Sequence, residues 1–102
     1  MPPARHTSLL ANHPDIAEIL PRFLTRLRTQ VAELRRLHAA GDSEKIRVIA
    51  HQLRGAGTSF GFPDLTTAAG DLEETILSNP PPPEISSVLT TLVEYIEQIE
   101  GF

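Results

Sequence analysis

Apolar residues recur along four segments of the chain at steps of three and four, the spacing that places them on one face of an α-helix. The first segment begins near Asp15, the second covers residues 44–61, the third begins at Pro63 and the fourth ends before Gly101. In chain order, the four apolar stripes consist of Leu20, Phe23, Leu24, Leu27, Val31, Leu34 and Leu37; Ile46, Ile49, Ala50, Leu53, Gly57 and Phe60; Leu65, Ala68, Ala69, Leu72 and Ile76; and Ile85, Val88, Leu89, Leu92, Tyr95, Ile96 and Ile99. The pattern predicts four amphipathic helices and carries no strand signal.

Short polar or proline-rich segments separate the four predicted helices. Residues 40–43 end the first helix and offer Asp42 or Ser43 as a cap for the second. Residues 78–83 predict a stop followed by a stiff, extended proline spacer. Pro21 either opens the long first helix or kinks a helix that began earlier.

The connections and the apolar pattern together predict the domain organisation. Residues 1–13 have no apolar period and predict a flexible N-terminal tail. Residues 14–102 are enough for one domain with a single modest core. Four amphipathic helices with short connections predict an all-α fold, an antiparallel four-helix bundle of up-down-up-down topology.

The composition excludes several classes of function. A net charge of −4 argues against a nucleic-acid binder, and no apolar run approaches the roughly 20 residues that span a membrane. The absence of cysteine excludes disulfide and thiolate chemistry and favours a reducing compartment. We therefore expect a cytoplasmic protein without a nucleic-acid or membrane partner, and a monomer is the default for this architecture.

The second predicted helix contains the segment AHQLRGAGTSFG, residues 50–61, in which three glycines occupy seven positions. A glycine inside a helix costs about 1 kcal/mol relative to alanine, so each needs a reason. On a helical wheel His51 points away from the apolar face, Gly55 lies beside it one turn later, and Gly57 lies at the centre of the apolar face. We expect Gly55 to leave space beside the imidazole, Gly57 to allow close helix packing, and Gly61 to adopt positive φ at the helix end.

Two interpretations of His51 compete. It is either an ordinary surface histidine, with Arg47 and Arg54 paired to solvent-exposed acids such as Glu44, or a nucleophile. A nucleophilic imidazole explains the surrounding residues together, because the arginines would neutralise an incoming phosphoryl group and Gly55 would admit another protein's active site. The first interpretation leaves Gly55 unexplained, so we prefer the second.

These residues resemble a known family. His51-Gln52-Leu53-Arg54-Gly55, followed by Gly61 and by Leu72-Glu73, is similar to the pattern of the histidine-containing phosphotransfer (HPt) domain, with arginine in place of its usual lysine. The segment AGTSFGF, residues 56–62, also resembles the phosphotransfer domain of chemotaxis histidine kinases. The resemblance covers roughly residues 15–100.

The resemblance implies a relay function. HPt domains accept a phosphoryl group on one exposed histidine, from a receiver-domain aspartate or a kinase, and pass it to a receiver domain. By this likeness His51 is the phosphoacceptor through Nε2, and Glu73 orients the ring through the other nitrogen, unless Glu73 is an ordinary boundary carboxylate. The residues expected to contact the phosphoryl group or the partner are Arg47, Gln52, Arg54 and Gly55.

The expected partners are response-regulator receiver domains and a sensor histidine kinase, hybrid kinases included. We expect no cofactor, with Mg²⁺ supplied on the partner receiver, and no metal site or enzymatic activity of the chain itself, because it has neither a ligand cluster nor a nucleotide loop. A docking patch of Ile16, Val48 and Thr58 is expected beside His51, together with Ile19, whereas Leu20 is expected in the core.

Two alternatives remain open from the sequence. One is a helical adaptor that resembles a phosphorylatable domain but is not phosphorylated. The other is the phosphoacceptor domain of a chemotaxis-type histidine kinase, which the AGTSFGF segment suggests.

Overall fold

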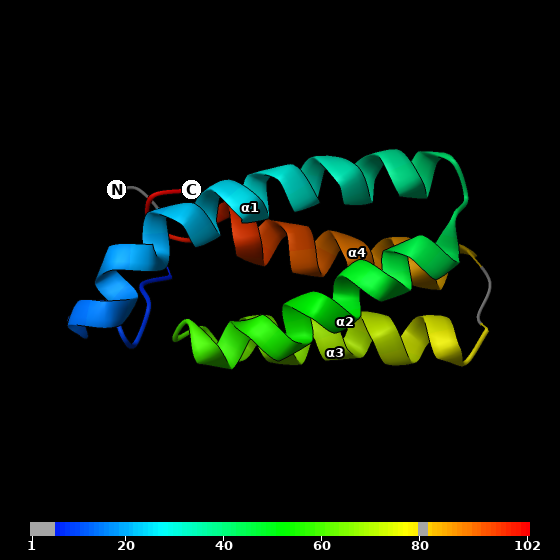
Figure 1. Ribbon diagram of the computed structural model, residues 1–102. Coiled ribbons are helices and arrows are strands. Elements are labelled where there is room, and N and C mark those ends of the chain that lie inside the picture. The colour runs from blue at the N-terminus through cyan, green and yellow to red at the C-terminus, as the bar shows by residue number, and fades with distance from the viewer. Residues whose placement is uncertain (1–5, 80–81) are drawn as a thin grey trace, which may run out of the picture.

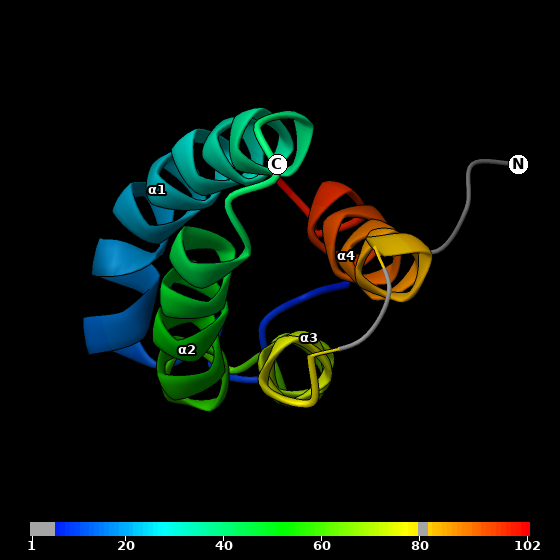
Figure 2. The same ribbon diagram turned by 90° about the vertical axis from the view of Figure 1, so that its right-hand side faces the viewer.

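The computed structural model describes residues 6–79 and 82–102, and four helices form its framework. They are α1 (Pro14–Ala39), α2 (Ser43–Ser59), α3 (Pro63–Leu77) and α4 (Pro82–Glu97). The helices run alternately in opposite directions, and seen end-on α2 lies between α1 and α3 while α4 lies between α3 and α1 (Figures 1 and 2). The predicted antiparallel four-helix bundle is confirmed.

The core consists of the predicted apolar stripes turned toward one another. Burying each large aliphatic side chain contributes roughly 1.5–3 kcal/mol, so the stripes are the main source of stability. The largest fully buried side chains are Leu27, Leu34, Leu37, Ile46, Leu53, Phe62, Leu65, Leu72, Leu92, Ile96 and Ile99. The helices that the apolar pattern predicted are therefore those that enclose the core. None of the helices in the described part of the chain has the length and hydropathy of a membrane span.

The helix ends follow ordinary capping chemistry. The Asp42 carboxylate accepts a hydrogen bond from the backbone N–H of Lys45 at 3.2 Å, so Asp42 is the cap of α2. Pro63 occupies the first turn of α3, where a missing N–H costs nothing. Pro82 and Pro83 likewise lie in the first turn of α4, so the predicted spacer over residues 78–83 is wrong for these two prolines. Pro80 and Pro81 lie outside the described residues.

Pro21 lies inside α1, which decides between the two alternatives for this residue. α1 begins at Pro14, and the first turns of the helix tilt away from the line of the rest (Figure 1). Proline lacks the N–H that would bond to the carbonyl of Ala17, and its ring crowds that carbonyl, which is the usual cause of such a bend.

Residues 6–13 cross the end of the bundle, which corrects the prediction of a flexible tail for this part of the chain. The His6 N–H donates to the Gln98 carbonyl at 2.8 Å, and the Glu100 N–H donates to the His6 carbonyl at 2.7 Å. The Leu9 N–H donates to the Gly61 carbonyl at 2.9 Å, and the largely buried Ser8 donates its hydroxyl to the carbonyl of Phe60. These contacts tie the N-terminal segment to the α2–α3 turn and to the C-terminal residues. Residues 1–5, the rest of the predicted tail, lie outside the described residues.

Candidate functional site

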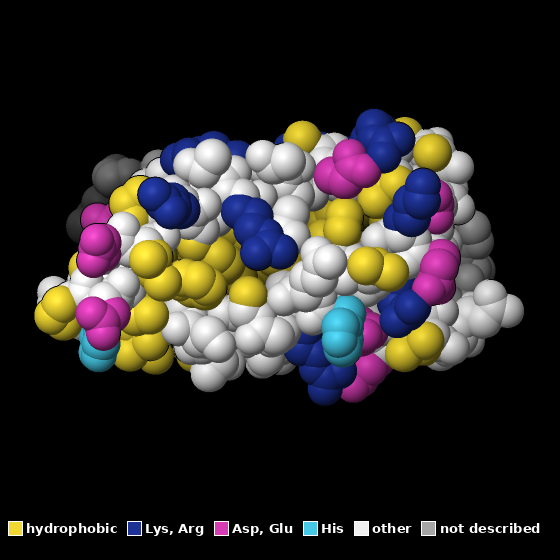
Figure 3. Space-filling view, in the orientation of Figure 1, with side chains coloured by type: hydrophobic (Ala, Val, Ile, Leu, Met, Phe, Trp, Pro, Cys, Tyr) yellow, Lys and Arg dark blue, Asp and Glu magenta, His cyan; other side chains and the backbone are white. Residues whose placement is uncertain are grey.

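α2 presents His51 on its outer face. Ala50 and Leu53, on either side in the helix, point into the core and are fully buried, whereas 70% of the His51 side chain is exposed. This follows from the helical wheel, because a residue next to a core position points to a different side of the helix. Figure 3 views the face that α1 and α2 form, from which a histidine and several Lys and Arg side chains stand out beside apolar side chains.

The imidazole of His51 is held from α3. Its Nδ1 lies 2.8 Å from Oε2 of Glu73, whose side chain is only 8% exposed. A buried carboxylate accepts a hydrogen bond, so it favours the tautomer with the proton on Nδ1. That tautomer leaves the lone pair on Nε2, on the exposed side of the ring. This contact between Glu73 and the imidazole is the one that an orienting role for Glu73 requires.

Two arginines share the same carboxylate. Arg54 Nη1 donates to Glu73 Oε1 at 3.2 Å, and Arg47 Nη1 lies 3.8 Å from Glu73 Oε2. Arg47 also pairs with Glu44 through its Nε and Nη2 atoms. The predicted cationic residues therefore gather around His51, anchored on the carboxylate that holds the ring.

The charged state of Glu73 depends on these contacts. Burial raises the pKa of the Glu73 carboxyl, but the hydrogen bonds from His51 and Arg54, with the charges of both, lower it further than burial raises it. The net result is a pKa below the ordinary value of 4.5, so the carboxylate is ionised near neutral pH and available as an acceptor.

Glu73 should therefore link the stability of the fold to acid pH. Since its pKa is lower in the folded protein than in the unfolded chain, its stabilisation is present above about pH 4.5 and is lost as the pH falls through the folded value. Glu73→Gln is expected to lower the free energy of unfolding near pH 7, and the difference from the wild type should shrink between about pH 5 and pH 3. Urea denaturation across this range measures the difference, and the variant Glu74→Gln, at the exposed neighbouring position, is the control. A difference in the free energy of unfolding that is the same at every pH would contradict the prediction.

The three glycines of the helix behave as their positions on the wheel predict. A Cβ at Gly55 would meet no atom within 4 Å, so the surface beside His51 is open. A Cβ at Gly57 would lie 2.5 Å from Thr66 Oγ1 and 2.7 Å from the Thr66 nitrogen, so α3 packs directly on the α2 backbone. Gly61 has φ +86° and follows the end of α2.

The other predicted contact residues are more dispersed. Gln52 accepts a hydrogen bond from Gln30 of α1 at 3.5 Å, which places Gln52 on the α1 side of His51. Val48 is 43% exposed, and Ile16 is half-buried on α1. Thr58 lies ten residues from Val48, about 15 Å along α2, and both its N–H and its hydroxyl bond to Thr66 Oγ1 of α3. Val48 and Thr58 therefore lie on either side of His51 along α2, and the docking patch with Ile16 stays a prediction.

Leu20 packs partly buried against the core, as expected, while Ile19 is 41% exposed.

Two residues of α3 belong to the site although they were not predicted from the sequence. Gly70 is buried beneath Arg54, and a Cβ there would lie 3.4 Å from Arg54 Nε and 3.5 Å from Arg54 Cδ. Thr66 donates its hydroxyl to the Arg54 carbonyl at 3.0 Å. Gly70 precedes Glu73 by three residues and shares its helix face, so this spacing was the available signal.

No group of three or more His, Cys, Asp or Glu side chains that could hold a metal ion occurs among the residues for which the structure is described.

The fold and the site together define a class of protein: a helical bundle with an exposed histidine whose ring contacts a buried carboxylate from the adjacent helix. A protein-family model described as the Hpt domain matches residues 18–101. The chain belongs to the Hpt domain family, and this membership supports a phosphotransfer role in two-component signalling. Comparison with curated proteins and comparison with solved structures each gave no match.

Proposed function

We propose that this protein is a phosphorelay intermediate whose phosphoacceptor is His51. It accepts a phosphoryl group from the phosphoaspartate of a receiver domain, or from a sensor histidine kinase, simple or hybrid, and passes it to a receiver domain. The observation that carries the proposal is the 2.8 Å contact between Nδ1 of the exposed His51 and the buried Glu73 carboxylate. An ordinary surface histidine has no need of a buried partner, which costs desolvation to keep.

The chemistry of the step follows from the ring geometry. The Nε2 lone pair attacks phosphorus, the N–P bond forms, and the P–O bond to the partner's aspartate breaks as the carboxylate leaves with the electron pair. Positive charge develops on the ring as the bond forms, and the Nδ1–H that faces Glu73 is where this charge is stabilised. The orienting role of Glu73 parallels that of carboxylates behind catalytic histidines in general.

Arg54 and Arg47 balance the charges of this step. Both contact Glu73 in the resting site, and Arg54 is about half exposed, so its guanidinium can reach toward an anionic phosphoryl group without leaving the surface. We infer that Mg²⁺ is supplied by the receiver and that the chain itself needs no cofactor, because phosphoryl transfer requires charge neutralisation that the partner's aspartate site would provide. The protein is then a phosphohistidine carrier and not an enzyme, acting as a cytoplasmic monomer.

Uptake of phosphate tests the proposal directly. The wild type is incubated with a receiver domain charged by acetyl phosphate and Mg²⁺, and its intact mass is measured before and after mild acid treatment. The expected result is one phosphate that is lost in acid, as a phosphohistidine would be, with the double variant His13→Gln/His38→Gln labelled equally. If several receivers bind the protein but none labels it, the proposal fails in favour of the non-phosphorylated adaptor.

The open surface at Gly55 gives a second expectation. Gly55→Leu places a branched side chain one turn from His51, where no atom lies within 4 Å of a new Cβ, so the fold should accept it. Transfer from a charged receiver should slow by at least about tenfold, because a displacement of about 1 Å in the approach of two reacting groups has large effects on rate.

Labelling by the small donor phosphoramidate should change little, since this donor needs no protein surface. The control is Ser59→Leu, which adds the same side chain at an exposed position one turn further from His51. Equal slowing by the two variants, or equal slowing with both donors, would contradict a clearance role for Gly55.

A further inference from the structure

Positive charge is confined to one half of the chain. All nine Lys and Arg residues lie at positions 5–54, and residues 55–102 contain none. Eight of the thirteen Asp and Glu residues lie beyond position 62. α1 and α2 are neighbours in the bundle, as are α3 and α4 (Figure 2). The fold therefore turns the asymmetry of the sequence into two faces of opposite charge.

The counts by helix show how complete the separation is. α1 and α2 together carry eight Lys and Arg and four Asp and Glu, whereas α3 and α4 carry seven Asp and Glu and no Lys or Arg. Within the described residues, the ion pairs of Lys and Arg that join the two halves are Arg35 with Glu97, Arg47 with Glu73, and Arg54 with Glu73 and Glu74. Five acids of the second half have no ion pair among the described residues: Asp64, Asp71, Glu84, Glu94 and Glu100.

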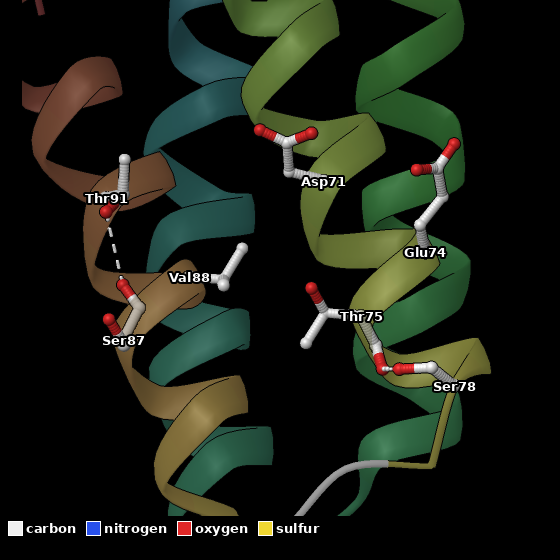
Figure 4. Close-up of a pocket in the computed structure, with 7 residues that line it drawn as sticks. All are labelled: Asp71, Glu74, Thr75, Ser78, Ser87, Val88 and Thr91. Carbon is white, nitrogen blue, oxygen red and sulfur yellow. Dashed lines mark hydrogen bonds between the residues drawn. The ribbon is translucent and has the colours of Figure 1, made fainter.

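The acidic half includes a groove between α3 and α4. Asp71 and Glu74 stand on the α3 wall of this groove, and Ser87 and Thr91 stand on the α4 wall (Figure 4). The groove has a volume of about 480 Å³, and its remaining lining is hydroxyl side chains and one valine. With no cation on either helix, the acids of this face that have no ion pair, Asp71 of the groove among them, present negative charge to an approaching protein.

The basic half contains the site. Arg22 and Arg26 are exposed, have no ion pair in the described part of the chain, and precede Gln30 by eight and four residues, so all three share one side of α1. Gln30 contacts Gln52, the residue next to His51. The two arginines therefore lie on the side of α1 that faces α2, along the same surface as His51.

We propose that this separation of charge orients the docking partner, an acidic protein surface that carries a phosphoryl group on a carboxylate beside Mg²⁺. Such a surface is attracted to the α1–α2 face and repelled from the α3–α4 face, so encounters are biased toward His51. The inference rests on the proposed function, since it takes the partner to be a phosphorylated receiver whose magnesium ligands are carboxylates. Fields of this kind raise association rates by about 10- to 1,000-fold and weaken steeply with salt.

Two double variants of equal net charge test the inference. Arg22→Gln/Arg26→Gln removes two positive charges from the α1–α2 face, and Ser87→Glu/Thr91→Glu adds two negative charges to exposed positions of α4. Each shifts the net charge of −4 by two units in the same direction, to −6. The second-order rate constant for transfer from an acetyl phosphate-charged receiver is measured at ionic strengths of about 0.02 M and about 0.5 M, where the screening lengths are about 20 Å and 4 Å.

At low salt the arginine variant is expected to react about five- to tenfold more slowly than the wild type, and the α4 variant less than about twofold more slowly. At high salt the three proteins should converge. Equal slowing of the two variants would show that net charge alone matters and would overturn the inference, as would a wild-type rate that is independent of salt. Absence of labelling at either salt would instead overturn the proposed function together with this inference.

Discussion

Replacing His51 with Gln is expected to abolish acid-labile phosphorylation entirely while the protein remains folded. Gln has no ring nitrogen to attack phosphorus, so no labelling should remain above background. Its amide N–H₂ can still donate to Glu73 in place of the imidazole, which avoids leaving the buried carboxylate without this partner. Because 70% of the His51 side chain is exposed, little packing is lost, and the free energy of unfolding should change by less than about 1 kcal/mol.

Intact mass after incubation with a charged receiver, together with a thermal melt, measures both parts of this result. His38→Gln serves as the matched control, because it is also a helical histidine but lies on α1, and it should label like the wild type. A folded His51→Gln protein that still gains an acid-labile phosphate would show that the phosphoacceptor is another residue.

Gly57→Ala is expected to lower the free energy of unfolding by about 3 kcal/mol, a large effect for the addition of one methyl group. The new Cβ would lie 2.5 Å from Thr66 Oγ1, 2.7 Å from the Thr66 nitrogen and 2.9 Å from the Phe62 carbonyl oxygen. Two of these three atoms belong to the backbone and cannot rotate away, so α3 must move from α2. The Thr66 hydroxyl would also lose its bonds to Thr58 and to the Arg54 carbonyl.

The matched control for Gly57→Ala lies two residues earlier in the same helix. Gly55→Ala meets no atom within 4 Å and replaces glycine in a helix interior, so it should raise the free energy of unfolding by about 0.4–1 kcal/mol. In thermal melts the Tm of Gly55→Ala should lie above that of the wild type, and the Tm of Gly57→Ala should lie below it by roughly 10–20 °C. Two variants of similar stability would contradict the close approach of α3 to the α2 backbone.

The apolar pattern predicted the four helices because each of them buries one continuous stripe. The exposed direction of His51 followed for the same reason, since Ala50 and Leu53 beside it had to point inward. The contact between His51 and Glu73 was expected only from the resemblance to HPt domains, because it depends on the register between α2 and α3, and the periodicity of a single helix does not contain this information. The contacts of Gly70 with Arg54 and of Thr66 with Thr58 escaped prediction for the same reason.

The N-terminal segment was predicted incorrectly for another reason. Three hydrogen bonds of residues 6–9 with the bundle run through backbone N–H and C=O groups, which every residue carries, so these bonds leave no sign in the sequence. The side chains of His6, Thr7 and Ser8 add contacts with Tyr95, Glu100 and the Phe60 carbonyl, which depend on the fold bringing these residues together. The one distinctive feature is Gly61, where a Cβ would lie 2.7 Å from the Leu10 nitrogen and 2.8 Å from the Leu9 nitrogen. Its positive φ was expected from the helix end alone, whereas the same glycine also makes room for the crossing segment.

The backbone bonds between His6 and residues Gln98 and Glu100 also bear on the order in which the protein folds. They join positions at nearly opposite ends of the chain, and closing so long a loop costs more entropy than pairing helices that are adjacent in sequence. We therefore expect the helical hairpins to assemble first and the crossing segment to dock after the transition state. Stabilising this end of the bundle would then slow unfolding and leave the folding rate almost unchanged. The crossing segment would thus contribute to the kinetic stability of the folded protein and not to the rate at which it forms.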